Sequence, residues 1–239
     1  MKFSFLLIFY LTSAVVLIIS LIGLPFKYFK FRFFVLLFTR NMTAVLRLFK
    51  INIEVVNAEF AYKKGCLYAS KHQSVFETIY FNELFYNPAY ILKKELLNIP
   101  LFGTYLKKLG MIAIDRAQGI QSLRHVNQQT AEYLDHRPVI IFPEGTRTTF
   151  KDQPDLKPGI YSMYKSLNKP VIPISLNSGK YWPKSNNVNK GTIKVEFKEA
   201  IPPGLSKQDF LKKLKSEINS LNHYCLLYTS PSPRDLQGS

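Results

Sequence analysis

The chain has 239 residues, 47% of them hydrophobic, and its 32 Lys and Arg against 16 Asp and Glu give a formal net charge of +16. This composition excludes a disordered chain and fits one domain of moderate size with an appendage. The two cysteines exclude a disulfide framework, and the positive charge favours a phosphate-rich partner, either nucleic acid or anionic lipid headgroups.

The first element is an apolar run from Phe3 to Leu24 that contains no charged residue. Its length is about the 20 residues that a helix needs to cross a bilayer, so the sequence predicts a membrane segment. A secretory signal is the alternative, but only Lys2 precedes the run, and Pro25 and its neighbours form no small-residue cleavage site. Two arrangements stay open: the run crosses the bilayer, or it turns back with residues 33–49 as a hairpin in one leaflet.

Aromatic and basic residues are interleaved in the next stretch, residues 26–34, and Arg40, Arg47 and Lys50 follow among apolar residues. Such a mixture is typical of the headgroup level of a membrane, and the cations indicate its cytoplasmic side. The sequence therefore predicts that residues 1–50 anchor the chain in a membrane and that the rest faces the cytoplasm. A nucleic-acid-binding module would leave the apolar run unexplained, so no nucleic-acid partner is expected.

From residue 51 the pattern changes to short strands that alternate with helices. We expect strands at residues 51–56, 65–70, 89–92, 111–114, 139–142, 171–176 and 192–197, and helices at 74–86, 100–109, 119–136, 159–167 and 206–221. This alternation predicts an α/β domain over residues 51–224 with a mostly parallel central sheet. The strands are continuously apolar, which indicates that helices cover both faces of the sheet.

The end of the chain, residues 225–239, is rich in Ser and Pro and is expected to be disordered. It resembles a translated sequencing adaptor, so we expect the native chain to end near Tyr224 and Cys225 to be foreign. Cys66, inside an apolar strand, is expected to be a reduced core residue. The segment Tyr181-Trp182-Pro183 fits either the membrane surface or the core.

A candidate base lies in the turn between the second strand and the helix that follows it. His72 comes directly after the strand, and Glu77 lies five positions further along. A carboxylate at this spacing can bond to one imidazole nitrogen and leave the other free as a base. Ser74 and Glu77 also match a capping box, and this structural role stays open beside the catalytic one.

Cationic and polar residues follow the other strands of the predicted sheet. The candidates for substrate binding are Lys93, Arg116, Glu144, Gly145, Thr146 and Arg147. Because the carboxyl ends of parallel strands meet at one edge of a sheet, we expect these residues to lie near His72. Arg and Lys side chains there can hold a phosphate. His, Cys and acidic residues nowhere show ligand spacing, so no metal is expected.

Four segments together resemble the four conserved blocks of the glycerolipid acyltransferases. They are His72-x-x-x-x-Glu77, Ile114-Asp115-Arg116, Phe142-Pro143-Glu144-Gly145-Thr146-Arg147 and Val171-Ile172-Pro173-Ile174. Their order and spacing, over roughly residues 50–205, are most similar to the bacterial 1-acylglycerol-3-phosphate branch of that family. The family usually has Asp where this chain has Glu77. Glutamate keeps the carboxylate, and a subset of bacterial relatives is similar in this respect.

The resemblance implies an enzyme of the bacterial inner membrane that makes phosphatidic acid. It would transfer a fatty acyl group from acyl-CoA or acyl-carrier protein, without a further cofactor, to the 2-hydroxyl of 1-acylglycerol 3-phosphate. The implied roles are base for His72, its orientation for Glu77, phosphate binding for Lys93, Arg116 and Arg147, and an acceptor pocket at Glu144, Gly145 and Thr146. Two alternatives remain: another lyso-lipid acceptor, such as a lyso-ornithine lipid or a lysophospholipid, and a non-catalytic membrane lipid-binding protein.

Overall fold

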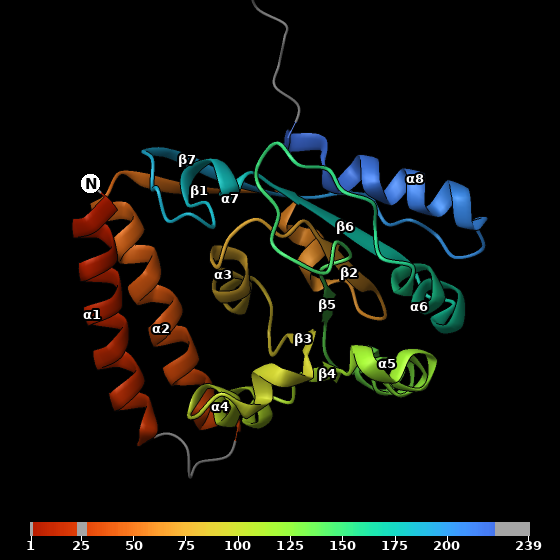
Figure 1. The fold of residues 1–239 in the computed structure, drawn as a ribbon, viewed down its shortest axis with the longest axis horizontal. Coiled ribbons are helices and arrows are strands. Elements are labelled where there is room, and N and C mark those ends of the chain that lie inside the picture. The colour runs from red at the N-terminus through yellow and green to blue at the C-terminus, as the bar shows by residue number, and fades with distance from the viewer. Residues whose placement is uncertain (1, 23–27, 223–239) are drawn as a thin grey trace, which may run out of the picture.

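The computed structural model describes residues 2–22 and 28–222, without the side chains of residues 28–30. It shows an α/β domain built on one seven-stranded sheet, with two long helices lying along one side (Figure 1). The predicted foreign tail at residues 225–239, with Cys225, lies outside the described residues.

The sheet contains all seven predicted strands, each within two residues of its expected bounds. They are β1 (Ile51–Val56), β2 (Leu67–Ser70), β3 (Ala89–Lys93), β4 (Ile112–Ile114), β5 (Val139–Ile141), β6 (Val171–Leu176) and β7 (Gly191–Phe197). Their order across the sheet is β1-β7-β6-β2-β5-β3-β4, and only β6 and β7 pair antiparallel. The predicted mostly parallel sheet is therefore confirmed.

The helices include the five predicted for the domain and several short ones that the sequence did not predict. The α-helices are α1 (Lys2–Leu21), α2 (Tyr28–Leu48), α3 (Phe76–Leu84), α4 (Phe102–Lys108), α5 (Gly119–Leu134), α6 (Gly159–Leu167), α7 (Ser178–Tyr181) and α8 (Lys207–Ile218). The 3-10 helices are η1 (Ala58–Tyr62), η2 (Lys94–Asn98), η3 (Arg116–Gln118) and η4 (Ser220–Asn222). Helix α3 begins two residues later than expected because residues 71–75 form a turn, which matters for the site.

Helices cover both faces of the sheet, as the apolar strands predicted. Side chains alternate across a strand, so Tyr68 packs on one face of β2 while Leu67 and Ala69 pack on the other. The Tyr68 face is covered by α1 to α4, and the Leu67 face by α5, α6 and α8 (Figure 1). Cys66 is buried and free among the described residues, as expected, and burial raises the pKa of its thiol.

Helix α1 is docked on the domain along one of its sides. Near its start, Phe5 and Phe9 meet the ring of Trp182 edge to face, with centroid distances of 5.1 and 5.0 Å. Near its end, the Ser20 and Tyr105 hydroxyls are 2.7 Å apart in a hydrogen bond. Trp182 is only 1% exposed, so of its two open placements the core is correct, and α1 itself supplies part of that core.

The opposite side of α1 is apolar and exposed. Its exposed large side chains are Phe3, Leu7, Tyr10, Leu11, Val15, Leu17, Ile18, Ile19 and Leu21, and Ile22 follows directly after it. By length and composition α1 could cross a membrane, and it is the one such helix within the described residues. Helix α2 lies beside α1 and returns the chain to β1 (Figure 1).

Candidate functional site

The turn between β2 and α3 places His72 at the carboxyl edge of the sheet. Strands β2, β3, β4, β5 and β6 are parallel to one another, so the segments that follow them meet at this edge. The imidazole is partly accessible, with 16% of the side chain exposed. The predicted gathering of polar residues therefore has its centre at a side chain that a substrate can reach.

Glu77 holds one nitrogen of the His72 ring. Nδ1 lies 2.9 Å from Oε1 of Glu77, whose side chain is completely buried in the first turn of α3. Nε2 has no hydrogen-bond partner within the residues that the structure describes. A carboxylate on Nδ1 favours the tautomer with the proton on that nitrogen, which leaves a free lone pair on Nε2, as the predicted base requires.

The same carboxylate also organises the backbone of the turn. Oε1 of Glu77 accepts hydrogen bonds from the amides of Gln73 at 2.6 Å and Ser74 at 2.7 Å, and Oε2 accepts one from the Ser178 hydroxyl at 2.9 Å. Ser74 completes the turn because its Oγ accepts from the amide of Phe76 at 3.2 Å. Only half of the predicted capping box is present: Glu77 accepts from the Ser74 amide, but α3 begins after Val75, and the Ser74 hydroxyl accepts from the Phe76 amide instead of capping the helix. The orienting role of Glu77 stays a prediction.

An aromatic ring fixes the plane of the base. Phe142, directly after β5, stacks on the His72 imidazole with a centroid distance of 4.1 Å and an interplanar angle of 21°. Tyr90 from β3 stacks in turn on Phe142 at 6.3 Å. His72 is therefore held at an edge by Glu77 and on a face by Phe142, which restricts rotation of the ring.

A buried ion pair lies behind the base. Lys71 and Glu144 have completely buried side chains, and Nζ of Lys71 is 2.5 Å from Oε1 of Glu144. Nζ also donates to the carbonyl of Asp152 at 2.8 Å. Burial raises the pKa of Glu144 and lowers that of Lys71, while their mutual attraction opposes both shifts. The Glu144 carboxylate, predicted to shape an acceptor pocket, thus points inward, toward the backbone of the base.

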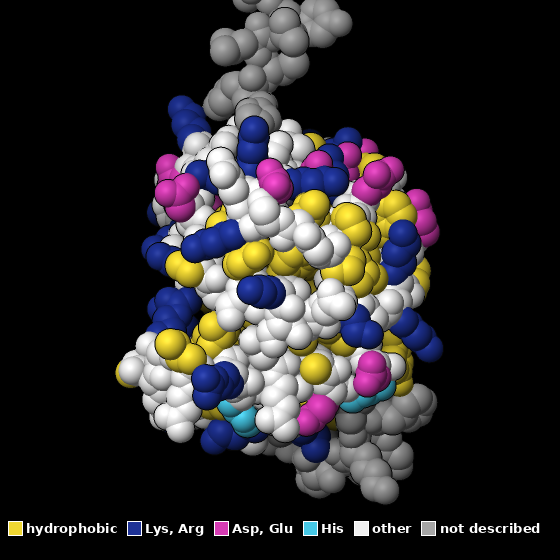
Figure 2. Space-filling view, turned by 90° about the vertical axis from the view of Figure 1, so that its right-hand side faces the viewer, with side chains coloured by type: hydrophobic (Ala, Val, Ile, Leu, Met, Phe, Trp, Pro, Cys, Tyr) yellow, Lys and Arg dark blue, Asp and Glu magenta, His cyan; other side chains and the backbone are white. Residues whose placement is uncertain are grey.

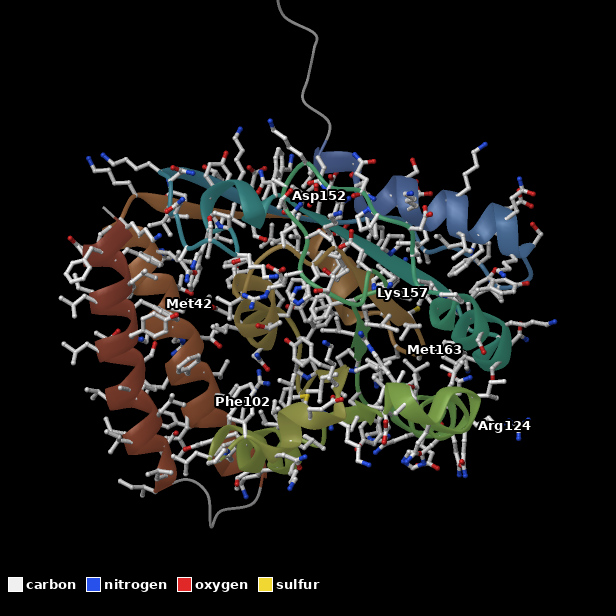
Figure 3. The ribbon with its side chains drawn as sticks, viewed as in Figure 1. Met42, Phe102, Arg124, Asp152, Lys157 and Met163 are labelled. Carbon is white, nitrogen blue, oxygen red and sulfur yellow. The ribbon has the colours of Figure 1, made fainter. Side chains whose placement is uncertain are left out.

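The loop after β5 forms hydrogen bonds with both the backbone amide and the backbone carbonyl of His72. The amide of His72 donates to Oε2 of Glu144 at 3.2 Å, and its carbonyl accepts from the amide and hydroxyl of Thr148 at 2.9 and 3.1 Å. Figure 3 shows Asp152 and Lys157 on the same loop, which joins β5 to α6. This loop carries Arg147, so the base and a predicted phosphate ligand belong to one hydrogen-bonded unit.

Gly145 lets two cations approach this loop. Nη2 of Arg116 donates to the Gly145 carbonyl at 2.8 Å. A β-carbon at Gly145 would lie 3.1 Å from Nη2 of Arg116 and 3.1 Å from Cγ of Lys157, and the backbone there has φ +71°. Both facts favour glycine. The Gly145 amide donates to the Phe142 carbonyl at 2.9 Å and is thus used within the turn.

The remaining predicted cations lie on the surface. Arg147 and Lys93 are exposed, and neither forms an ion pair within the described residues. Lys94 pairs with Asp115 at 3.2 Å, which keeps the pKa of Asp115 below its ordinary value. Thr146 is also exposed. Both cations are thus open to solvent, and their binding of an anion stays a prediction.

Sequence reasoning missed three residues that support the site: Lys71, Phe142 and Ser178. Two of them gave a partial signal, since Phe142 begins one of the motifs already singled out and Lys71 directly precedes His72. Ser178 gave none, because it acts on Glu77 from α7, a helix of four residues. Within residues 2–22 and 28–222, no group of three or more His, Cys, Asp or Glu side chains could hold a metal ion.

Comparison with protein families gives a match that covers this edge up to residue 177. A family model described as acyltransferase matches residues 52–177, more than half of the chain. The matched range contains His72, Glu77 and the loop from Phe142 to Thr148.

Several curated proteins are similar, and those named here are called 1-acyl-sn-glycerol-3-phosphate acyltransferase. One from Pseudomonas aeruginosa is 39% identical over 61% of this chain and 57% of its own length. One from Helicobacter pylori is 33% identical over 64% of this chain and 67% of its own. The chain thus spans little more than half the length of the Pseudomonas relative.

A solved structure shares the fold. The crystal structure of a 1-acyl-sn-glycerophosphate acyltransferase from Thermotoga maritima matches with a TM-score of 0.74 and 19% identity. The match covers 92% of this chain and 94% of that one, so it extends over the helices at the start of the chain as well as the sheet.

Proposed function

The chain belongs to the acyltransferase family, and from this premise we propose that it acylates the 2-hydroxyl of 1-acylglycerol 3-phosphate. The acyl donor would be acyl-CoA or acyl-carrier protein, and the product phosphatidic acid. The observation that carries the proposal is the 2.9 Å contact between His72 Nδ1 and Glu77, with Nε2 left unpaired on a partly exposed ring. The names of the relatives support the choice of acceptor.

The reaction needs one base and no covalent enzyme intermediate. Nε2 of His72 takes the proton of the 2-hydroxyl as the oxygen attacks the thioester carbonyl. The tetrahedral intermediate then breaks its carbon–sulfur bond, and the imidazolium returns the proton to the leaving thiolate. Glu77 stabilises the imidazolium through Nδ1 in both steps. Ser74 is not assigned as a nucleophile, because it is only 1% exposed and its hydroxyl contacts the Phe76 amide within the turn.

The acceptor phosphate would bind to the exposed cations beside the base. Arg147 offers a forked guanidinium and Lys93 a single ammonium, which suit two or three phosphate oxygens. Arg116 assists from its bond to the Gly145 carbonyl. The backbone of Glu144, Gly145 and Thr146 would line the acceptor pocket.

Residues 1–50 would attach the acyltransferase domain, residues 51–224, to a membrane. Helix α1 is docked on the domain near both of its ends, and its other side is apolar and exposed. These facts favour a hairpin of α1 and α2 in one leaflet over a helix that crosses the bilayer alone. The cations Arg40, Arg47 and Lys50 support the cytoplasmic side of a bacterial inner membrane.

The deciding experiment is acyl transfer by the detergent-solubilised protein, with both donors, beside the variant His72→Ala. We expect His72→Ala to lower kcat by about 10³-fold or more with its fold intact, because the reaction loses its base. Arg147→Ala should raise KM for 1-acylglycerol 3-phosphate and leave KM for a phosphate-free lyso-lipid unchanged. Full activity of His72→Ala would refute the base.

The same assay separates the alternatives. Turnover with a lyso-ornithine lipid or a lysophospholipid, and none with 1-acylglycerol 3-phosphate, would move the assignment to that acceptor. No turnover with any acceptor, in protein that is folded by circular dichroism, would favour a lipid-binding protein without catalysis.

A further inference from the structure

Lys71 is a completely buried lysine next to the base, and the reaction above gives it no task. Lysine is almost never fully buried unless it is paired, because the ammonium loses its hydration. Its two acceptors are Oε1 of Glu144 and the carbonyl of Asp152, both on the loop after β5. The lysine therefore joins the end of β2 to that loop through charge.

Glu144 passes this connection on to the backbone of His72. One carboxylate oxygen faces Lys71, and the other accepts from the His72 amide at 3.2 Å and lies 3.4 Å from the Thr148 hydroxyl. Thr148 in turn donates twice to the His72 carbonyl. The chain of contacts forms a closed ring, and Arg147 is covalently attached to one of its members.

We infer that Lys71 is a positioning residue for the proposed acyl transfer. Its charge keeps Glu144 a carboxylate, which binds the His72 amide and lies against Thr148. These contacts fix the position of His72 relative to Arg147. The inference rests on the proposed function. It assigns no contact with substrate to Lys71, whose side chain is completely buried.

The charge of Lys71 is needed because Glu144 is buried as well. A buried carboxylate without a countercharge takes up a proton or draws in water, and either change rearranges its acceptors. The Glu144 pKa is already raised by burial, and Lys71 is the main influence that lowers it. Loss of Lys71 should thus loosen the ring of contacts even though Lys71 itself touches neither His72 nor Arg147 through a side-chain bond.

A purely stabilising ion pair is the competing interpretation, and a double substitution separates the two. Replacing both members of a buried ion pair by apolar side chains often restores stability. Lys71→Met with Glu144→Leu should therefore regain the melting temperature that Lys71→Met alone loses. The double substitution also removes Oε2 of Glu144, the acceptor of the His72 amide, so the kcat of the double variant should stay about 10–100-fold below the native value.

A second pair of variants tests the acceptor itself. Lys71→Met with Glu144→Gln keeps a neutral oxygen for the His72 amide and should recover part of the lost kcat. Lys198→Met is the matched control. Lys198 forms an ion pair with Glu196, with 2.8 Å between the two side chains, and this pair lies away from the site, so the substitution should leave kcat unchanged. Native kcat in the Lys71→Met and Glu144→Leu double variant would overturn the inference.

Hydrogen exchange provides a readout that does not depend on activity. In the native protein the amides of His72 and Thr148 should exchange slowly, and in Lys71→Met both should exchange about tenfold faster or more, while amides within β6 do not change. If Lys71→Met does not fold, the double variant with Glu144→Leu takes its place. In that variant the His72 amide should exchange faster than it does in the native protein. Native exchange at both amides in the folded variant would overturn the inference.

The activity assay and hydrogen exchange test the two proposals separately. A native protein that turns over no acceptor refutes the proposed function, and the exchange rates still decide whether Lys71 holds the His72 backbone. A native protein that is active, with Lys71→Met equal to it in kcat, KM and exchange, refutes the role of Lys71 alone.

Discussion

At the scale of single residues, Glu77 uses the two oxygens of one carboxylate for different tasks. Oε1 accepts from the His72 ring and from two backbone amides, and Oε2 accepts from Ser178. Four donors therefore surround this buried carboxylate, three on Oε1 and one on Oε2, and they replace the water that burial removes. The longer arm of glutamate does not prevent a 2.9 Å contact with the imidazole.

This geometry separates the effects of two substitutions. Glu77→Gln should lower kcat by about 10²-fold or more and the free energy of unfolding by about 1–3 kcal/mol, because an amide has one acceptor oxygen for these donors. Glu77→Asp keeps the charge and should retain much of the activity. Steady-state kinetics and urea unfolding of the same samples provide the test, with the exposed Glu83→Gln on α3 as control. If Glu77→Gln loses stability at native kcat, the residue is a cap and nothing more.

The sequence made His72 and Glu77 predictable and hid Lys71. The first pair lies within one turn, so local spacing predicted its contact. Lys71 meets Glu144 across 73 positions of sequence, and only the pairing of β2 with β5 brings them together. A charged residue at a strand end is ordinarily solvated, which is why its burial could not be predicted.

At the scale of elements, helix α1 has one side that packs on the domain and another that is apolar and exposed. Its buried side chains recur at Phe5, Phe9, Ser13, Val16 and Ser20, a spacing of three to four residues that keeps them on one face. The remaining sides are almost wholly apolar, so the helix contributes both to the core of the domain and to a surface that water does not favour.

A substitution on each side should therefore have a different consequence. Phe9→Ala removes a ring packed on Trp182 and should lower the free energy of unfolding in detergent by about 3–5 kcal/mol, with little change in binding to vesicles. Leu11→Asp, on the exposed side, should weaken flotation with anionic phospholipid vesicles and leave the melting temperature nearly unchanged. Loss of vesicle binding by both variants in proportion to their stability would contradict this division.

Strands and long helices were predictable from periodicity, and short elements were not. Continuous apolar runs indicated five of the strands, and the alternation of apolar and polar residues indicated β1 and β7. Helix α7 has four residues, about one turn, too few for any period to appear. Its first residue, Ser178, nevertheless reaches Glu77, so part of the site was lost with it.

At the scale of the whole molecule, two opposite sides differ in character. Helices α1 and α2 form one side, and Figure 2 shows the other, over α5, α6 and α8, where Lys and Arg side chains are spread among polar and hydrophobic ones. The site lies between them, at the carboxyl edge of the sheet. For the proposed reaction, the first side offers an apolar surface that suits a lipid acceptor, and the second a charged and polar surface that suits a water-soluble thioester donor.

Buried tyrosines determine how the whole fold responds to alkali. Burial raises the pKa of Tyr80 to about 12 from 10.0 and also raises that of Tyr68. Between pH 10.0 and about 12, Tyr80 loses its proton in the unfolded chain and keeps it in the native state, so the free energy of unfolding should fall as pH rises above 10. Tyr80→Phe should reduce the fall by about 1–2 kcal/mol at pH 11.5, as measured by urea unfolding in detergent. The exposed Tyr62→Phe is the control, and equal slopes in both variants would contradict the assignment.

The docking of α1 on Trp182 also constrains how the protein is made. The helix is translated before the sheet, and its partner Trp182 is about 180 residues further along the chain, while Gly191 of β7 follows its partner Ile51 of β1 by about 140 residues. At typical rates of synthesis this interval is on the order of ten to forty seconds. Throughout it, α2 can pack beside α1, but the side of α1 that will contact Trp182 and the exposed apolar side both lack a protein partner. A nascent chain of this kind would enter a bilayer or bind a chaperone before its own core exists, so assembly of the domain would begin with its anchor already in place.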